Sequence, residues 1–332
     1  MDLTLNPDQV ALRAGIREYL ADRWDAGRLR VLVSGSTAAA GTALTARDWK
    51  ELAGLGVFGL LLPESFGGMG LGLADAAIVF EELGAALVPG PLVPTALAVS
   101  MIPGAADGDA IVAMLDLTTR GPAVIEHLGL ATHVAVVSGD GLFVLPASGL
   151  AATPLEPLDP LSPVAVAAGD VPALISRAER VGSAADAASW RLRGTVLTAA
   201  LQVGVAQGEL DLGVRYVTER EQFGRVVGSF QAVKHLLAES LVRLELARAA
   251  VLAAALTADD PGAGDLAVAA ATAKVLADDA ATTGGRTCVQ VHGGMGFTWE
   301  VLAHLYLKRA WVHETTFGTS GEHEAFLAAQ LA

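Results

Sequence analysis

R-E-Q-F-G-R-V-V-G-S-F-Q, the stretch from Arg220 to Gln231, lies between two long helical patterns. The guanidinium of Arg220 is a planar fork of donors that can hold a pyrophosphate at two points. Gln231 begins a helical pattern, and the free N–H groups at a helix N-terminus favour a nearby anion. A surface arginine is usually only solvated. This stretch taken alone therefore leaves open whether Arg220 binds a phosphate group or is merely solvated.

A second stretch, C-V-Q-V-H-G-G-M-G-F-T, runs from Cys288 to Thr298. Its glycines allow the backbone to approach a ligand closely and to adopt positive φ. A lone G-G-x-G would indicate only a tight turn between helices, but the flanking Gln290 and Phe297 make the string more specific. We expect His292 to be a structural hydrogen-bonding group rather than an acid or a base.

Together the two stretches resemble the flavin-binding signatures of the acyl-CoA dehydrogenase family. In that family the arginine at the position of Arg220 reaches across a subunit interface to the FAD of the neighbouring chain. A third, C-terminal signature touches flavin in relatives, and Thr319 belongs to it. The resemblance therefore implies FAD shared across an interface, with these cofactor-binding positions: Arg220, Gln222, Phe223, Phe230, Gln231, Gln290, Gly293, Gly294 and Thr319.

The catalytic base of the family is missing from both of its usual positions. The family takes the α-proton of an acyl-CoA with a carboxylate in a dry site and passes the β-hydrogen to FAD as hydride. The base is usually the Glu of Y-E-G-T, which here reads T-F-G-T with Phe317 at that position. Some members place the base on the first helix of the C-terminal bundle, where alignment of V-G-V-A-Q puts Gly194. Neither residue can accept a proton, so we expect no catalytic residue in this chain.

Apolar spacing predicts helices on both sides of a middle region of strands. Small residues such as Gly204 on the first long C-terminal helix should allow a neighbouring helix to approach closely. Glu81 and Glu82 read as part of a solvated helix face. The predicted helices span residues 6–24, 46–55, 74–84, 187–219, 231–257, 266–291 and 300–313, and a Gly/Ser/Ala/Thr-rich connector covers 34–45.

The middle region, about residues 111–171, alternates short apolar runs with Gly, Asp and Pro, as strands and turns do. It is too short for a closed barrel of strands of usual length. It also lacks the T-E-P…G-S-D-like string that packs on the flavin ring in the family. We expect a mainly α fold with a small β-domain, acyl-CoA dehydrogenase-like: an N-terminal helical domain (1–105), a truncated middle β-domain (106–185) and a C-terminal four-helix bundle (186–332).

Composition excludes several classes of partner. The 332 residues are 52% hydrophobic and carry a formal charge of −14, which a nucleic-acid backbone would repel. The single cysteine, Cys288, rules out an internal disulfide and suits a reducing cytoplasm. We see no secretory signal pattern, no uncharged apolar run of membrane-spanning length and no metal site, and we therefore expect a cytoplasmic protein with no membrane partner.

The pattern of retained and missing residues favours the non-catalytic subunit of a heteromeric acyl-CoA dehydrogenase, most simply a dimer of heterodimers. A homologous catalytic subunit would supply the base, the substrate would be an acyl-CoA, with a steroid side-chain thioester preferred, and an electron-transfer flavoprotein-like acceptor is compatible. One alternative is a self-sufficient homo-oligomer with a non-standard base such as Glu314 or Glu322. Another is a flavin-free, acyl-CoA-binding pseudoenzyme.

Overall fold

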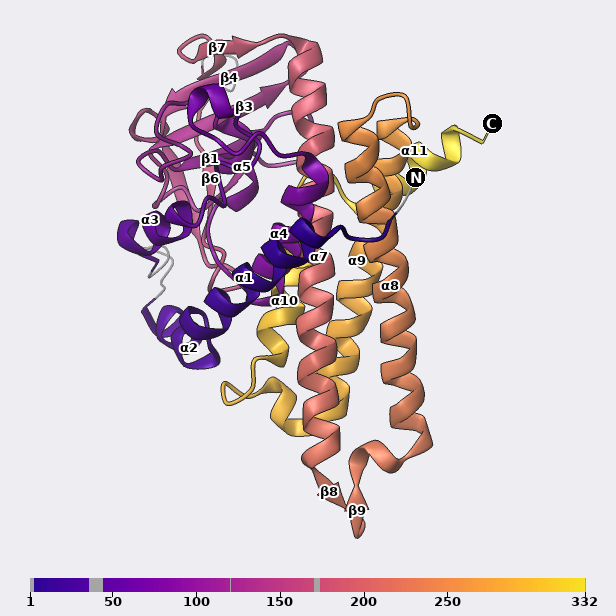
Figure 1. Ribbon diagram of the computed structural model, residues 1–332. Helices are drawn as coiled ribbons and strands as arrows, with labels where there is room; N and C mark the ends of the chain where they lie inside the picture. The colour runs from indigo at the N-terminus through magenta and orange to yellow at the C-terminus, as the bar shows by residue number, and fades with distance from the viewer. Residues whose placement is uncertain (1–2, 36–43, 120, 170–173, 332) are drawn as a thin grey trace. The chain divides into compact units, whose positions relative to one another are not determined.

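A computed structural model describes residues 3–35, 44–119, 121–169 and 174–331 (Figure 1). By their internal contacts the residues form two compact units. The bundle unit comprises Met1–Arg28, Ala77–Val88 and Thr195–Ala332, and the sheet unit comprises Leu29–Ala76 and Pro89–Gly194. Each unit joins stretches that are distant in the sequence, so the linear division into three domains remains a prediction.

The bundle unit contains the long C-terminal helices, except for the first turns of α7, which belong to the sheet unit, and all four predicted helices are confirmed. They are α7 (Ala184–Glu219), α8 (Gln231–Asp259), α9 (Leu266–His292) and α10 (Ala303–Thr315), followed by the unpredicted α11 (Ser320–Ala329). Helices α8 and α9 pack along each other, and α10 and α11 both pack on α9. None of the helices in the described part of the chain is long and apolar enough to cross a membrane.

Helix α1 (Pro7–Arg23) begins where the sequence predicts, because Asn6 caps it. The Asn6 side chain accepts from the Gln9 N–H at 2.9 Å, and the Gln9 side chain accepts from the Asn6 N–H at 3.1 Å. This reciprocal capping box satisfies two of the donors that a helix start otherwise leaves without partners.

Helix α4 (Leu73–Ala85) lies backbone to backbone against α7. A Cβ atom on Gly204 would overlap the carbonyl oxygen of Glu81, and one on Gly84 would overlap the carbonyl oxygen of Leu201. Only glycine fits at such a contact. The structure confirms the prediction that small residues of α7 allow a close helix neighbour.

We expect Gly204→Ala to lower the free energy of unfolding by about 1–3 kcal/mol, because the added methyl group forces two helix backbones apart. Gly15→Ala is the matched control, since a Cβ atom at that α1 position meets no atom within 4 Å. The control should be stabilising by about 0.5–1 kcal/mol from reduced backbone freedom. Urea unfolding measures both, and equal stabilities would contradict the close packing of α4 on α7.

Glu81 and Glu82 are not on a solvated face, and the prediction for them was wrong. Both are buried, with 8% and 5% exposure. Arg17 of α1 pairs with Glu82 at 2.7 Å, and Arg248 of α8 pairs with Glu81 at 2.9 Å. Burial raises the pKa of Glu81, while the Arg248 guanidinium opposes that rise. The ion pairs offset the cost of burying the two carboxylates and connect α1 and α8 to α4.

Two helices of the sheet unit were not predicted. Helix α3 (Ala46–Gly54) was predicted, and it begins with a capping box in which Thr45 and Asp48 form reciprocal hydrogen bonds. The unpredicted ones are α5 (Leu92–Ala98) and α2 (Ala26–Gly35), whose first residues belong to the bundle unit. Most of the predicted connector, residues 36–43, lies outside the described residues.

The described strands of the sheet unit form two small sheets rather than the single closed barrel that a larger domain would allow. The first has the order β1 (Val112–Asp116), β3 (His133–Ser138), β4 (Gly141–Pro146), β7 (Glu179–Gly182), with β1 parallel to β3 and the other pairs antiparallel. The second is antiparallel, with the order β2 (Val124–Glu126), β6 (Val164–Ala167), β5 (Ala152–Leu155). The small β-domain is thus confirmed.

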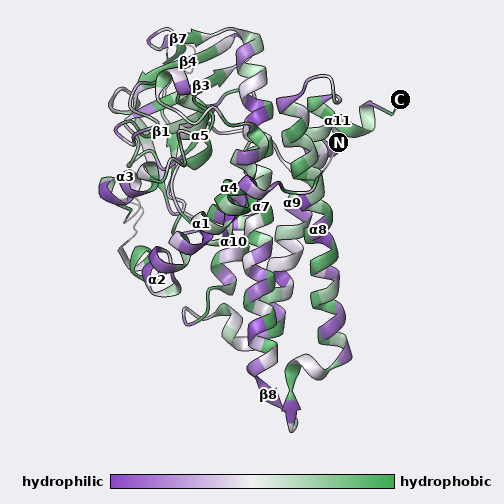
Figure 2. Cartoon of the chain, viewed as in Figure 1, coloured by the Kyte–Doolittle hydropathy of each residue, from purple (hydrophilic) through white to green (hydrophobic). Residues whose placement is uncertain are grey.

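The apolar runs at 112–115, 133–137, 142–145 and 164–168 predict strands, and the structure has β1, β3, β4 and β6 there, of which the first three are mostly buried. Strands β3 and β4 are hydrophobic along most of their length (Figure 2), and Val134, Val136 and Leu145 pack in one core with Leu115 and Ile125. Strands buried on both faces read as continuous apolar runs. The missed strands β2, β5 and β7 are short and partly exposed, so they lack that pattern.

Candidate functional site

The candidate site begins where α7 ends, with a two-stranded hairpin at the end of the bundle (Figure 1). Strands β8 (Glu221–Gln222) and β9 (Arg225–Val226) pair with only Phe223 and Gly224 between them. Both turn residues have positive φ, 56° and 76°, as a two-residue type I′ turn requires. Phenylalanine is an unusual residue in this conformation, and Phe223 as a whole is 91% exposed. The hairpin therefore presents an aromatic ring to the outside of the chain.

Two arginines of this hairpin have different surroundings. The Arg225 guanidinium lies 3.9 Å from the centroid of the Phe230 ring, a cation–π contact. Phe223 meets the same ring edge to face at 6.1 Å. Arg220 is exposed, and its guanidinium has no hydrogen bond or ion pair with any residue that the structure describes. Arg220 thus has its donors available for an anion.

The start of α8 stands beside this arginine. The Arg220 carbonyl accepts from the Val227 N–H at 2.7 Å, which fixes the path of the chain into the helix. Phe230 occupies the N-cap position and provides no side-chain cap. Gln231, the first helical residue, is exposed. The N-terminus of a long helix without a side-chain cap has donors that favour an anion.

The second stretch lies at the end of α9. Gln290, Gly293 and Gly294 are exposed, Gly293 has a φ of 60°, and a Cβ atom on either glycine would meet nothing within 4 Å. Gly296 differs, because a Cβ atom there would lie 2.6 Å from the Val289 carbonyl oxygen. The glycine pair therefore leaves space for a ligand, whereas Gly296 serves the packing of the turn.

Contacts from the last turns of α7, just before Arg220, hold the second stretch near the end of that helix. The Tyr216 ring of α7 stacks on the His292 ring of α9 at 4.2 Å, and its hydroxyl lies 4.0 Å from the Met295 sulfur. His292 Nδ1 donates to the Cys288 carbonyl at 2.7 Å, and burial lowers the pKa of the imidazole. His292 is thus a structural hydrogen-bonding group, as predicted. Eight predicted cofactor positions lie at the end of α7, in the hairpin, at the start of α8 or at the end of α9: Arg220, Gln222, Phe223, Phe230, Gln231, Gln290, Gly293 and Gly294.

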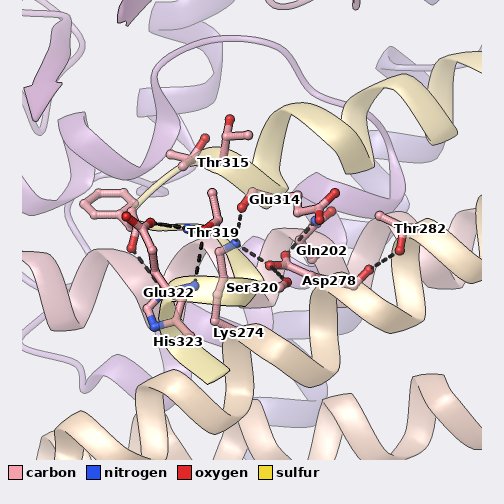
Figure 3. Close-up of polar contacts among 12 residues, drawn as sticks. Gln202, Lys274, Asp278, Thr282, Glu314, Thr315, Thr319, Ser320, Glu322 and His323 are labelled. Atoms are coloured by element: carbon pink, nitrogen blue, oxygen red, sulfur yellow. Dashed lines mark hydrogen bonds and ion pairs between the residues drawn. The ribbon is translucent and has the colours of Figure 1, made fainter. Parts of the chain in front are cut away.

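Thr319 lies elsewhere in the bundle unit. It is the N-cap of α11, where its N–H and hydroxyl both donate to the Glu322 carboxylate. The adjacent Ser320 bonds to Asp278 of α9 at 2.9 Å (Figure 3). Asp278 lies about 20 Å along α9 from His292, at about 1.5 Å rise per residue. The structure therefore does not bring Thr319 together with the other eight positions, and its contact with flavin stays a prediction.

The two positions that hold a base in relatives are both buried. Phe317 is 1% exposed and has a φ of 62°. Gly194 lies inside α7 and is the last residue of the sheet unit. Neither can accept a proton, and the absence of a catalytic residue from this chain stays a prediction. Over the described ranges, no three His, Cys, Asp or Glu side chains gather as metal ligands would.

Sequence reasoning missed one buried carboxyl group, that of Glu209 in α7. Both of its oxygens are buried, and neither has a hydrogen-bond partner in the described part of the chain. Cβ atoms on Gly284 and Gly285 of α9 would come within 2.8 and 2.5 Å of these oxygens, so the two glycines make room for the carboxyl group. Burial raises its pKa well above the usual range. In the sequence, this group could have been noticed as an acidic residue next to the small residues of one face of α7.

Two family models match the chain: the N-terminal domain of acyl-CoA dehydrogenase over residues 6–107 and its C-terminal domain over residues 187–332. Acyl-CoA dehydrogenase IpdE2 of Mycobacterium tuberculosis is 37% identical over 262 residues, 77% of either protein. Acyl-CoA dehydrogenase FadE34 of the same organism is 36% identical over 88% of this chain. The chain spans only 45% of the length of FadE34.

Solved structures agree with these matches. The Tcur3481-Tcur3483 steroid ACAD, solved as a variant, has a TM-score of 0.84 and 27% identity, covering 99% of this chain and 98% of that one. The ChsE4-ChsE5 complex from Mycobacterium tuberculosis has a TM-score of 0.83 and 24% identity over 100% and 99%, a likeness of fold alone. The models, relatives and fold lead to one conclusion: this chain belongs to the acyl-CoA dehydrogenase family.

Proposed function

We propose that this chain is the non-catalytic subunit of an FAD-dependent acyl-CoA dehydrogenase and completes the FAD site of a homologous catalytic subunit. The observation that carries the proposal is an asymmetry within the bundle unit. Residues that match the contacts to a neighbour's FAD are exposed except for the half-buried Phe230, and the Arg220 guanidinium has no partner among the described residues. The C-terminal base position instead holds the buried Phe317. The partner would supply the carboxylate that removes the α-proton, and FAD would accept the hydride.

The residues at the hairpin end fit the phosphate and adenosine side of FAD. The Arg220 fork can bind a pyrophosphate in two places, and the α8 N-terminus adds a favourable dipole. Gly293 and Gly294 leave open space beside Gln290, so a flat group can approach the backbone. These groups bind and orient a cofactor, and none of them takes part in proton transfer.

Exposed apolar side chains support a protein partner. Leu241, Val242 and Leu246 of α8 are exposed, as is Phe223 at the hairpin tip. Large apolar side chains gathered on one helix are typical of a surface that another protein covers. The names of the Tcur3481-Tcur3483 steroid ACAD and the ChsE4-ChsE5 complex each pair two chains, which supports a heteromeric assembly, most simply a dimer of heterodimers.

The steroid ACAD among the similar structures supports an acyl-CoA with a bulky steroid side chain as the substrate class. Loss of one of two active sites in each dimer would leave room for such a group. An electron-transfer flavoprotein-like acceptor and a cytoplasmic location complete the proposal.

The ratio of flavin to protein in the purified complex tests the proposal. We expect one FAD for each pair of unlike chains, because only the partner holds a flavin ring. One FAD for every chain would support a self-sufficient dehydrogenase instead. A complex that contains no flavin, and that forms equally well with Arg220→Ala, would support a flavin-free pseudoenzyme.

Neither carboxylate of the self-sufficient alternative should matter for turnover. Glu322 is exposed and caps α11 through Thr319, whereas a base needs a dry site. We expect Glu314→Gln and Glu322→Gln to change the rate of flavin reduction by less than about two-fold. Replacing the partner's own base should slow that rate by about 10²–10⁴-fold. A loss of that size from either glutamine variant would identify the base in this chain.

A further inference from the structure

The turn between α10 and α11 has an unusual backbone. It consists of residues 316–320 and is called the Phe317 turn below. Phe317 and the following Gly318 both have positive φ, 62° and 105°. A left-handed conformation is strained for a non-glycine residue, and for a bulky side chain it is rare. Something around the turn must therefore select this conformation over the ordinary ones.

Both ends of the Phe317 turn are attached to one buried ion pair on α9 (Figure 3). Lys274 Nζ donates to Asp278 Oδ2 at 2.6 Å and to the Glu314 carbonyl, before the turn, at 3.1 Å. Ser320 Oγ, at the end of the turn, donates to the same Asp278 oxygen at 2.9 Å. The side chains of Lys274 and Asp278 are 0% and 2% exposed, so solvent does not screen these contacts.

The two charges are placed to favour both helix ends that border the turn. Lys274 approaches the last carbonyls of α10, where a cation is favourable, and Asp278 approaches the first residue of α11, where an anion is favourable. Asp278 also accepts from Gln202 Nε2 of α7 at 2.9 Å. Inside the turn, a ring nitrogen of His323 lies 3.2 Å from the Phe317 carbonyl oxygen.

We propose that the Lys274–Asp278 ion pair holds the Phe317 turn in one conformation, in which the Phe317 ring permanently fills the position where relatives carry a base. The inference rests on the proposed function only in treating that position as a former catalytic one. Phe317 is 1% exposed, so its ring is part of the core. Lys274, Asp278 and Ser320 are positioning residues in this account and do not touch the reacting atoms.

Amide hydrogen exchange of the whole chain, alone or with its partner, tests the attachment. Ser320→Ala removes one hydrogen bond to a buried carboxylate, and we expect the amides of residues 313–320 to exchange about ten-fold faster or more. Thr282→Ala is the matched control: its hydroxyl donates to the Asp278 backbone carbonyl at 2.8 Å and does not contact the turn. Equal exchange of the turn in both variants would overturn the proposal.

A second pair of variants tests the closed position. Phe317→Leu keeps an apolar side chain there, and we expect its unfolding midpoint to stay close to that of the parent. Phe317→Glu would bury an unpaired carboxylate, so its midpoint should fall far below that of the leucine variant. Equal midpoints would show that the position opens to solvent and would contradict the proposal. Flavin takes no part in either readout, so a complex that lacks FAD would reject the proposed function separately.

Discussion

Arg220→Ala is expected to weaken the binding of FAD to the complex by about 10–100-fold. That loss corresponds to about 1.4–2.8 kcal/mol, the contribution of one hydrogen bond to a charged group, and a second bond of a bidentate guanidinium would add to it. The Arg220 side chain has no intramolecular partner in the described chain that could be lost instead. Flavin fluorescence during dilution or dialysis of the complex measures the change in Kd.

Arg225→Ala is the matched control for this prediction. It removes the same charge from the same hairpin, but this guanidinium lies over the Phe230 ring. We expect at most a few-fold change in the Kd for FAD. Arg220→Lys should give an intermediate affinity, since it keeps the charge and loses the planar fork. Equal losses from Arg220→Ala and Arg225→Ala would show that only net positive charge matters, and the assignment of Arg220 to a pyrophosphate would fail.

Glu209→Gln is expected to stabilise the protein increasingly as the pH rises. Burial, with no hydrogen-bond partner among the described residues, holds the pKa of Glu209 well above its usual value of 4.5, so at pH values below that raised pKa the folded protein keeps the carboxyl neutral. At pH values below the pKa of the unfolded state, both the folded and the unfolded protein carry the proton. The carboxyl then does not lower the free energy of unfolding through its ionisation. Above the unfolded pKa the unfolded state loses the proton while the folded state keeps it, so parent stability falls with rising pH until the folded pKa is reached.

Within the window between the unfolded and the folded pKa, the difference in free energy of unfolding between the variant and the parent should grow by about 1.4 kcal/mol per pH unit. The glutamine has nearly the same shape and cannot ionise. Cys288 and Tyr306 also feel the Glu209 charge, but burial raises the pKa of both beyond the window. Denaturant unfolding at several values between pH 5 and pH 8 measures the gap. Glu324→Gln, at an exposed site, is the control and should give a curve parallel to that of the parent, whereas a parallel curve for Glu209→Gln would contradict a neutral buried acid.

Local signals in the sequence were sufficient for much of the fold. The Asn6 cap, the start of α8 at Gln231 and the apolar runs of β3 and β4 each depend on neighbouring residues, and the structure confirms them. Helices α2, α5 and α11 and the short strands β2, β5 and β7 were missed, because their formation depends on packing against other elements.

Contacts between distant residues explain the other misses. Glu82 is buried because Arg17 reaches it from 65 positions away, and Glu81 because Arg248 reaches it from 167 positions away. The room for Glu209 comes from glycines of another helix. At the candidate site, motif strings located the eight clustered positions, but no local pattern indicated that Thr319 lies at a distance from them or that an ion pair fixes the Phe317 turn.

The visible absorption spectrum of this chain, purified alone and then co-expressed with a homologous base-bearing subunit, tests the central claim most directly. We expect the lone chain to show no flavin absorption. The co-expressed pair should be yellow and should bleach when a steroid side-chain CoA thioester is added without an electron acceptor. A lone chain that is already yellow and is reduced by an acyl-CoA would contradict the shared site and show that this chain contains its own base.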